Sequence, residues 1–371
     1  INDPAFADQV IRDGKADFIE LGRQGFADPE FPNKAFSGRE DYIRKCVRCF
    51  SCYPGFCEHK TDVPLWEKGL SKEEVDRIYS PASMGRCAIN PDSGFGWYED
   101  RHPYPAESRE VLIVGGGVGG LQAAVTASKR GHRVTLLEKT GELGGTINFT
   151  DQDEDKVDLR NFKNLLIREA RESCPDIRME TPCSREILDE IKPDAVIIAI
   201  GSKPIIPNIP GADSGCVVKS HKLLAQKDVS AGKAVVIGGG LVGMEVAEFL
   251  AGKGSSVTVV EMKDSVLGEL GQLRKIGTHM AMAQEDIQVL VNTTCKEIRA
   301  DEVIVEQDGK ERMLAADLVV MAIGSKPVPS QDLQDTCAEA GIPCYVVGDA
   351  LAAPRLALNA IHEAYRAALS I

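Results

Sequence analysis

The amino-acid sequence predicts an α/β protein of several domains, in which one strand–glycine turn–helix–strand unit occurs twice behind a cysteine-rich segment. Glycine-rich turns follow apolar, β-branched runs at 110–120 and at 233–243. The phrase AIGSKP occurs at 199–204 and again at 322–327. Five of the eleven cysteines lie between positions 46 and 87. The length of 371 residues exceeds one ordinary hydrophobic core, which is why we expect more than one domain.

The composition is typical of a globular protein, with 43% apolar and 27% charged residues. The formal charge of −13 argues against a nucleic-acid partner, because phosphate binding requires a basic face. No apolar run reaches the length of a membrane span and no signal peptide opens the sequence, so we expect no membrane partner and a cytoplasmic, reducing compartment. The first residue is Ile1 rather than methionine, which suggests that the natural chain begins upstream.

The N-terminal stretch INDPAFADQVIRDGKADFIELGRQGF predicts a helix followed by a buried strand. Gly22 and Arg23 come directly after the expected strand. An arginine beside a backbone N–H group at a strand end suits a phosphate, whereas the alternative is an ordinary surface arginine.

The cysteine-rich segment could serve a disulfide framework, a zinc site or an iron–sulfur cluster. Cys46, Cys49 and Cys52 form a C-x-x-C-x-x-C run, and Cys87 lies farther along in GRCAINP. Disulfide frameworks are typical of small secreted domains, and zinc sites prefer paired C-x-x-C motifs, which Cys87 lacks. A tight run with one distant partner favours a [4Fe–4S] cluster on these four thiolates. Cys57 either replaces Cys52 as a ligand or is a bystander.

The first repeated unit is EVLIVGGGVGG, followed by an alanine-rich helical stretch and the strand HRVTLLE. The spacing of Gly115, Gly117 and Gly120 suits a tight turn, close backbone approach to a pyrophosphate, and close helix–strand packing. The helix N-terminus offers N–H groups to phosphates. Glu138 ends the second strand, where a carboxylate can accept both ribose hydroxyls.

The second unit, AVVIGGGLVGMEVAEFLAGKGSSVTVVE, repeats this pattern 123 positions later. Its glycines are Gly238, Gly240 and Gly243, its terminal carboxylate is Glu261, and the second AIGSKP contains Gly324. A single glycine motif is a weak signal, because such turns also serve plain packing. Two copies with matching downstream phrases predict two dinucleotide sites.

The arrangement around the first unit resembles the two-dinucleotide flavoproteins with a disulfide-reductase-like fold. The matching pieces are GELGG with Gly144 and Gly145, and YVVGDA before a C-terminal helical pattern. The resemblance implies FAD on the first unit and a nicotinamide cofactor on the second, with Asp349 bonded to the ribityl chain. It also implies that the last helix points its N-terminus at the flavin ring. Glu261 would repel a 2′-phosphate, which favours NADH over NADPH.

The stretch GGTINFT contains no cysteine where disulfide reductases carry a redox pair. We therefore disfavour disulfide chemistry and expect a cluster to take single electrons from the flavin.

The pieces GR, ADPEFPNKA, IRKCVRC, CAINP and NAIHEAY resemble the Old Yellow Enzyme-like reductases that carry a [4Fe–4S] cluster. That family includes 2,4-dienoyl-CoA reductase, enoate reductases and trimethylamine dehydrogenase. The resemblance implies that Gly22 and Arg23 contact the phosphate of an FMN held by a (β/α)8 barrel. It implies electron flow from NADH through FAD and the cluster to FMN, for reduction of an activated C=C bond in an enoate, enone or enoyl-CoA. The substrate pocket would lie in the barrel, so the sequence names no catalytic acid.

The resulting domain hypothesis assigns 1–45 to the end of the barrel and 46–105 to the cluster segment. It assigns 106–205 with 329–371 to an FAD domain and 206–328 to an NAD(H) domain. A departure from the family is the long segment between Cys57 and Cys87, where Ser71 and Glu74 predict a capped helix. Two alternative functions are an amine dehydrogenase and a separate electron-transfer subunit, and a homo-oligomer is compatible with either.

Overall fold

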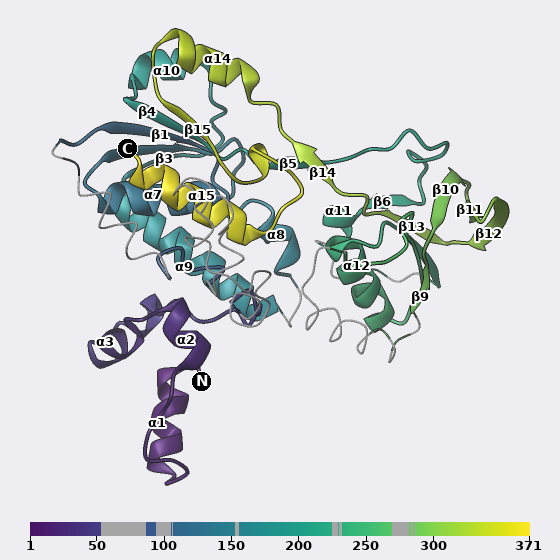
Figure 1. Ribbon diagram of the computed structural model, residues 1–371, viewed down its shortest axis with the longest axis horizontal. Helices are drawn as coiled ribbons and strands as arrows, with labels where there is room; N and C mark the ends of the chain where they lie inside the picture. Colours follow the sequence, from purple (N-terminus) through teal and green to yellow (C-terminus); the bar gives the residue numbers. More distant parts are fainter. Residues whose placement is uncertain are drawn as a thin grey trace, which may run out of the picture. The chain divides into compact units, whose positions relative to one another are not determined.

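The computed structural model describes residues 1–52, 87–93, 105, 107–152, 156–224, 229, 232–268, 282, 285 and 287–371. Contacts divide the chain into two compact units (Figure 1). Unit 1 comprises Ile1–Ile147, Asp153–Gly201 and Pro327–Ile371, and unit 2 comprises Asn148–Gln152 and Ser202–Lys326. The predicted helix at Ser71–Glu74 and the uncertain ligand Cys57 lie outside the described residues.

Unit 1 is built on a five-stranded sheet in the order β15-β4-β1-β2-β3, and every pair of neighbours is parallel. Its strands are β1 (Glu110–Val114), β2 (Arg133–Leu137), β3 (Asp176–Arg178), β4 (Ala195–Ile198) and β15 (Cys344–Val346). Both faces are covered, which explains the nearly continuous apolar runs of the central strands. The predicted α/β class is therefore confirmed.

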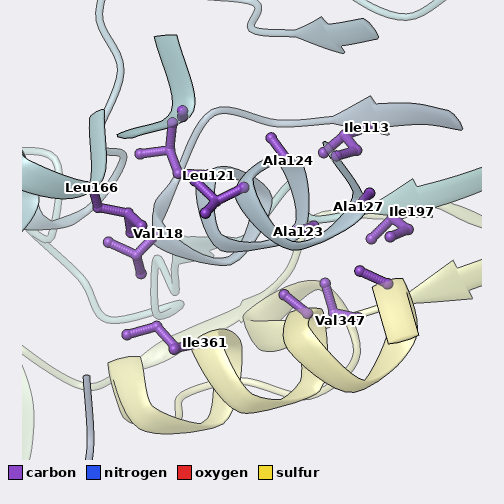
Figure 2. Packing of buried hydrophobic residues seen from close by; sticks show 14 of the residues in the cluster. Ile113, Val118, Leu121, Ala123, Ala124, Ala127, Leu166, Ile197, Val347 and Ile361 are labelled. Atoms are coloured by element: carbon purple, nitrogen blue, oxygen red, sulfur yellow. The ribbon is translucent and has the colours of Figure 1, made fainter. Parts of the chain in front are cut away.

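Helices on the two faces receive alternate side chains of the strands. Ile113 joins the cluster formed with α7 (Val118–Lys129), α9 (Val157–Ser173) and α15 (Ala357–Leu369). Leu112 joins the opposite cluster, formed with α10 (Arg185–Ile191) and α14 (Gln331–Glu339). Figure 2 shows Val118 of α7 and Ile361 of α15 pointing toward each other. The C-terminal helical pattern is thus a core helix that packs directly on the first glycine-turn helix.

Unit 2 contains a second parallel sheet in the order β6-β13-β7-β8-β9. Its strands are β6 (Val217–Lys219), β7 (Lys233–Ile237), β8 (Ser256–Val260), β9 (Ile287–Leu290) and β13 (Leu318–Met321). One face packs on α11 (Ser220–Leu224) and α12 (Leu241–Gly252). The other packs on an antiparallel sheet of β10 (Thr293–Ile298), β11 (Glu302–Gln307) and β12 (Lys310–Ala315).

The offset of 123 positions is kept in the element bounds themselves. It relates β1 to β7, α7 to α12, β2 to β8 and β4 to β13, residue for residue. It also relates β5 (Ser202–Pro204) to β14 (Ser325–Pro327), which pair as a two-stranded sheet. The sequence repeat is therefore a repeat of backbone structure, and each copy has its own hydrophobic core.

The N-terminal residues form short helices rather than the end of a sheet. These are α1 (Pro4–Arg12), α2 (Gly22–Ala27), α3 (Phe31–Phe36) and the 3-10 turn η1 (Glu40–Tyr42). The first helix was expected, but the buried strand that should follow it was a wrong prediction. Residues 13–21 have no strand conformation and the Phe18 side chain is 89% exposed. A strand requires a neighbour to pair its backbone groups, and no described strand lies beside this stretch. The barrel assignment stays a prediction.

None of the described helices combines the length and the apolar composition that a membrane span requires.

Candidate functional site

The first glycine turn can be made only by residues without a side chain. Gly115 has a φ of 108°, and a Cβ atom there would lie 2.5 Å from the carbonyl oxygen of Ala199. A Cβ atom at Gly120 would lie 1.8 Å from the carbonyl oxygen of Gly115. These glycines therefore let β1 turn directly into α7 and let the helix lie against the strand, as their spacing predicted.

The N-terminus of α7 is left open by the same residues. The helix begins after Gly117, whose missing side chain would meet nothing nearer than the Cα atom of Gly145, at 3.9 Å. Gly144 donates its N–H to the carbonyl of Gly116 at 2.9 Å, which draws the GELGG stretch alongside the turn. The first N–H groups of a helix have no partner within it. The result is a cradle of bare backbone that fits a pyrophosphate.

The Glu138 side chain stabilises the first glycine turn by hydrogen bonds to its backbone. One carboxylate oxygen accepts the N–H of Gly116 at 2.7 Å, and the other accepts the N–H and the hydroxyl of Thr140, both at 2.8 Å. The side chain is buried. A carboxylate accepts about four hydrogen bonds, so Glu138 retains little capacity for ribose hydroxyls in this arrangement. The Thr140 hydroxyl also lies 3.1 Å from the carbonyl of Glu142, an alternative acceptor that would release capacity on Glu138.

The second turn reproduces the first in its geometry. Gly238 has a φ of 110° and lies against the carbonyl of Ala322, and a Cβ atom at Gly243 would lie 1.9 Å from the carbonyl oxygen of Gly238. Glu261 accepts the N–H of Gly239 at 2.6 Å.

Three features of the second turn bear on ligand binding. Nothing lies within 4 Å of the Cβ position of Gly240, at the start of α12. From the part of the chain that the structure describes, the other oxygen of Glu261 accepts one hydrogen bond, from the N–H of Lys263 at 2.8 Å, so this carboxylate keeps more acceptor capacity than Glu138. Leu267 occupies the place of Gly144 and donates its N–H to Gly239 in the same way.

The two AIGSKP phrases end their strands in mirrored hydrogen bonds. The N–H of Ile205 donates to the carbonyl of Gly324 at 3.0 Å, and the N–H of Val328 donates to the carbonyl of Gly201 at 3.0 Å. Gly324 and Gly201 have positive φ angles of 98° and 70°. Gly324 thus accepts a hydrogen bond that joins the two phrases. Its role as a cofactor-binding residue stays a prediction.

The loop of Asp349 is braced by an ion pair that the sequence did not reveal. Arg355 pairs with Glu363 of α15 through both guanidinium nitrogens, and their side chains are 24% and 20% exposed. Glu363 accepts the N–H of Gly348 at 2.8 Å, and the N–H of Arg355 donates to Asp349 at 3.0 Å. Asp349 is therefore fixed in the middle of η5 (Gly348–Ala350), the element that precedes α15.

The four candidate cysteine ligands fall in one region of unit 1. Cys87 is 8% exposed and belongs to the same core cluster against which Cys46 and Cys49 pack. Between the cysteines of the run, Arg48 and Phe50 adopt left-handed φ angles of 54° and 57°. Left-handed residues are uncommon outside glycine, and they curl this short loop instead of extending it.

Burial raises the pKa of two of these thiols. It raises the pKa of Cys87 to about 11, and it also raises the pKa of Cys52, with Cys49 as a second cause. The thiols of Cys87 and Cys52 are thus held neutral unless a bound metal displaces their protons. Within the described ranges, no three His, Cys, Asp or Glu side chains are close enough to hold a single metal ion. A cluster takes one thiolate on each iron, so its four ligands need not converge on a single ion.

A polar scaffold fixes the backbone on both sides of the cysteines. Gln24 accepts the N–H of Cys46 at 2.8 Å and donates to the carbonyl of Arg44 at 3.1 Å. Arg44 donates to the carbonyl of Ile89 at 2.7 Å and pairs with Glu169 of α9. These roles were missed, because nothing in the local pattern links positions so far apart.

The motif ADPEFPNKA supports the same scaffold. Its Asp28 is 4% exposed, accepts the N–H of Arg44 at 2.8 Å, and pairs with Lys34 at 2.6 Å. Lys34 also donates to the carbonyl of Tyr42 at 3.0 Å. The sequence singled out this motif as a family signature, and the structure gives it a physical task beside the cysteine run.

Two side chains of α15 reach the Cys87 segment. The Nε2 atom of His362 lies 2.9 Å from the carbonyl oxygen of Cys87, and the ring is 1% exposed. One turn later, the Tyr365 hydroxyl lies 3.4 Å from Asp92. The motif NAIHEAY contained this signal, but its partner lies 275 positions earlier in the sequence.

Gly22 and Arg23 begin the short helix α2 and are exposed. The Arg23 guanidinium lies 4.3 Å from the centre of the Phe50 ring, so it stacks on the cysteine loop. Their contact with an FMN phosphate stays a prediction.

Comparison with known proteins gives matches along the whole chain. Residues 109–364 match the family model described as pyridine nucleotide-disulphide oxidoreductase. An NADH oxidase of Thermoanaerobacter brockii is 34% identical over 383 residues, covering 100% of this chain and 54% of the relative. A bilirubin reductase of Mediterraneibacter gnavus is 31% identical over 367 residues, covering 98% of this chain and 53% of the relative.

A solved structure of 2-naphthoyl-CoA reductase with 2-naphthoyl-CoA covers the chain with a TM-score of 0.84 at 26% identity. The match includes 100% of this chain and 53% of that one. This chain therefore spans about half the length of the relatives it matches.

Proposed function

Since the chain belongs to the pyridine nucleotide-disulphide oxidoreductase family, we propose that it is the electron-delivery part of an NADH-dependent flavin oxidoreductase. In this proposal the first glycine turn binds FAD and the second binds NADH. Cys46, Cys49, Cys52 and Cys87 hold a [4Fe–4S] cluster, and Gly22 with Arg23 lie at the phosphate of FMN. When bound, these groups would accept a hydride and pass its electrons on singly.

The observation that carries the proposal is that the two glycine turns have the same backbone geometry and the same glutamate contact. Both have the φ and the close carbonyl contact that exclude side chains, and both end in a buried glutamate that holds the turn. A site that had lost its dinucleotide would be free to accept side chains at Gly117 and Gly240, because little surrounds either position. Two intact cradles favour a donor and an acceptor dinucleotide on the same chain.

The residues of this chain have separate tasks in the proposed reaction. The N-termini of α7 and α12 bind pyrophosphates, and Asp349, braced by Arg355 and Glu363, faces the ribityl chain of FAD. Because Gly117 and Gly240 have no side chains, the N–H groups at the two helix N-termini stay accessible to a pyrophosphate. At the second site, Glu261 has capacity for ribose hydroxyls and repels a 2′-phosphate, which favours NADH.

We assign the final acceptor to the class of activated C=C bonds. The support is the names of two relatives: a cinnamate reductase of Clostridium sporogenes, 32% identical over 339 residues, and 2-naphthoyl-CoA reductase. Cinnamate is an unsaturated acid and 2-naphthoyl-CoA is the thioester of an aromatic acid, so each name describes reduction of a conjugated acid or thioester. The groups that would bind such a substrate belong to the proposed barrel, so no residue here is assigned to that step.

An anaerobic NADH titration, followed by visible absorption, tests the proposal. We expect the flavin bands to bleach first and the broad cluster absorbance to fall afterwards. NADPH at the same concentration should be at least about tenfold less effective, because Glu261 opposes its extra phosphate. An unchanged spectrum with NADH would contradict the proposal and favour the amine dehydrogenase alternative, in which electrons run outward from FMN.

A further inference from the structure

One short stretch of α15 touches three parts of the candidate site at once. A Cβ atom at Gly119, in the first turn of α7, would lie 3.3 Å from the carbonyl oxygen of Ala360. Glu363 accepts the N–H of Gly348 beside Asp349. Between these positions, His362 bonds to the carbonyl of Cys87. The same turn of helix therefore contacts the first dinucleotide turn, the Asp349 loop and a candidate cluster ligand.

The chemistry of the bond from His362 is determined by its partner. A backbone carbonyl can only accept, so Nε2 carries the proton and donates it to Cys87. The ring is 1% exposed, which shields the bond from water. Loss of the donor would leave a buried carbonyl without this hydrogen bond, in a segment whose backbone direction sets where the Cys87 thiol points.

The rest of the Cys87 segment is held from another direction. Arg44 donates to the carbonyl of Ile89, and the Asn90 side chain donates to the carbonyl of Phe26 at 2.9 Å. These contacts join the segment to the N-terminal region that carries the other three cysteines. The contact from His362 is thus a direct hydrogen bond between the main chain of Cys87 and the helix of the proposed flavin site.

We propose that His362 is a positioning residue that fixes Cys87 to α15, so that one helix sets both the flavin pocket and the fourth ligand of the cluster. The part of this inference that concerns the cluster rests on the proposed function, whereas the hydrogen bond that holds Cys87 does not depend on it. Residues behind a metal ligand orient it, and their loss usually lowers metal affinity by about 10- to 100-fold.

The test compares His362→Leu with His362→Gln in the complete protein. Leucine fills much of the volume but donates nothing, whereas the glutamine amide can place an N–H near Nε2. The matched control is His132→Leu, because His132 is a second buried histidine of unit 1, and its ring accepts the N–H of Arg109 at 3.2 Å rather than bonding to a candidate ligand. We expect His362→Leu to lose iron to a chelator about 10- to 100-fold faster than the wild type, with a changed EPR signal of the reduced cluster.

FAD content separates a positioning role from general damage. His362→Leu should keep FAD, and His362→Gln should restore the rate of iron loss to within about threefold of the wild type, since it restores the donor. Equal rates in His362→Leu and the wild type would overturn the inference. Equal iron loss in the leucine and glutamine variants, or loss of FAD together with iron, would also overturn it, because both indicate packing alone.

A second readout requires no cluster. In iron-free protein, alkylation of Cys87 by iodoacetamide, mapped by mass spectrometry, should be about tenfold faster in His362→Leu than in the wild type or His132→Leu, because the buried thiol loses its tether. Identical rates would overturn the inference. If the wild type binds no cluster after reconstitution, the proposed function fails, and this alkylation experiment still decides the role of His362.

Discussion

At the scale of single residues, one glycine variant in each turn tests each of the two proposed dinucleotide sites separately. Gly120→Ala forces a Cβ atom to 1.8 Å from a carbonyl oxygen, and Gly243→Ala to 1.9 Å. We expect each variant to lose at least about tenfold in affinity for its own dinucleotide and about 1–3 kcal/mol of stability, as overpacking does. Gly120→Ala should lose FAD, whereas Gly243→Ala should keep FAD but no longer be bleached by NADH.

The control for both variants is Gly252→Ala at the end of α12, where nothing surrounds the new methyl group. It should leave both affinities unchanged. Flavin fluorescence after ultrafiltration and the NADH titration measure the two outcomes, and a Gly243→Ala protein that bleaches normally would remove the second turn from the proposal.

His132 provides a pH-dependent prediction at the same scale. Burial lowers its pKa below the usual 6.5, so the folded chain resists protonation that the unfolded chain accepts. The unfolded state therefore binds more protons below about pH 6.5, and the free energy of unfolding falls as pH falls through that range. The slope from this one group is at most about 1.4 kcal/mol per pH unit.

His132→Leu should remove that contribution. In urea denaturation at pH 7.5 and pH 5.5, the wild type should lose more stability than the variant. Equal losses in the two proteins would show that the imidazole does not resist protonation.

At the scale of elements, the candidate cysteine ligands and the glycine turn lie on different segments that share one core, so their cofactors should be lost separately. We expect Cys87→Ser to lose the proposed cluster while FAD stays bound, because Cys87 is a proposed ligand, whereas the proposed FAD cradle is formed by β1 and α7. Iron analysis and flavin absorbance of the purified variant measure both. Full retention of iron would instead assign the fourth ligand to Cys57, and Cys174→Ser, at a buried cysteine of unit 1 outside the predicted ligand set, is the control.

The elements that the sequence predicted correctly are those with a local signal. The glycine spacing and apolar runs located β1, α7, β7 and α12, because these motifs encode their own geometry. The expected strand after α1 failed for the converse reason, since a strand is stable only with a neighbour to pair with. The sequence did not predict the contacts of Gln24, Arg44 and His362, because their partners are distant in sequence. The periodicity of a local stretch carries no information about such contacts.

At the scale of the whole molecule, the two units have separate cores and should respond separately to ligands. NADH at about 100 times its Kd should stabilise unit 2 by about 2.7 kcal/mol and leave unit 1 unchanged. Differential scanning calorimetry of the FAD-loaded protein should therefore show a shift in only one of two transitions. The Gly243→Ala variant should show no shift, whereas a single transition that moves as a whole would contradict independent units.

The resemblance to the Old Yellow Enzyme-like reductases is confirmed at this scale by the NADH oxidase, cinnamate reductase and 2-naphthoyl-CoA reductase matches. It could be recognised because the signature motifs are spread along the chain, from ADPEFPNKA to NAIHEAY. The substrate could not, since substrate contacts depend on side chains that these motifs do not contain.

The bond from His362 to Cys87 also has a consequence for the order of biosynthesis. A ribosome adds about 5–20 residues per second, so the 275 positions between the two residues take roughly 15–55 s to translate. During that interval the nascent Cys87 segment exists without the helix that anchors it. For the proposed cluster, iron delivery should therefore follow completion of α15, and a chain terminated before that helix would lack the hydrogen bond that holds the main chain of Cys87.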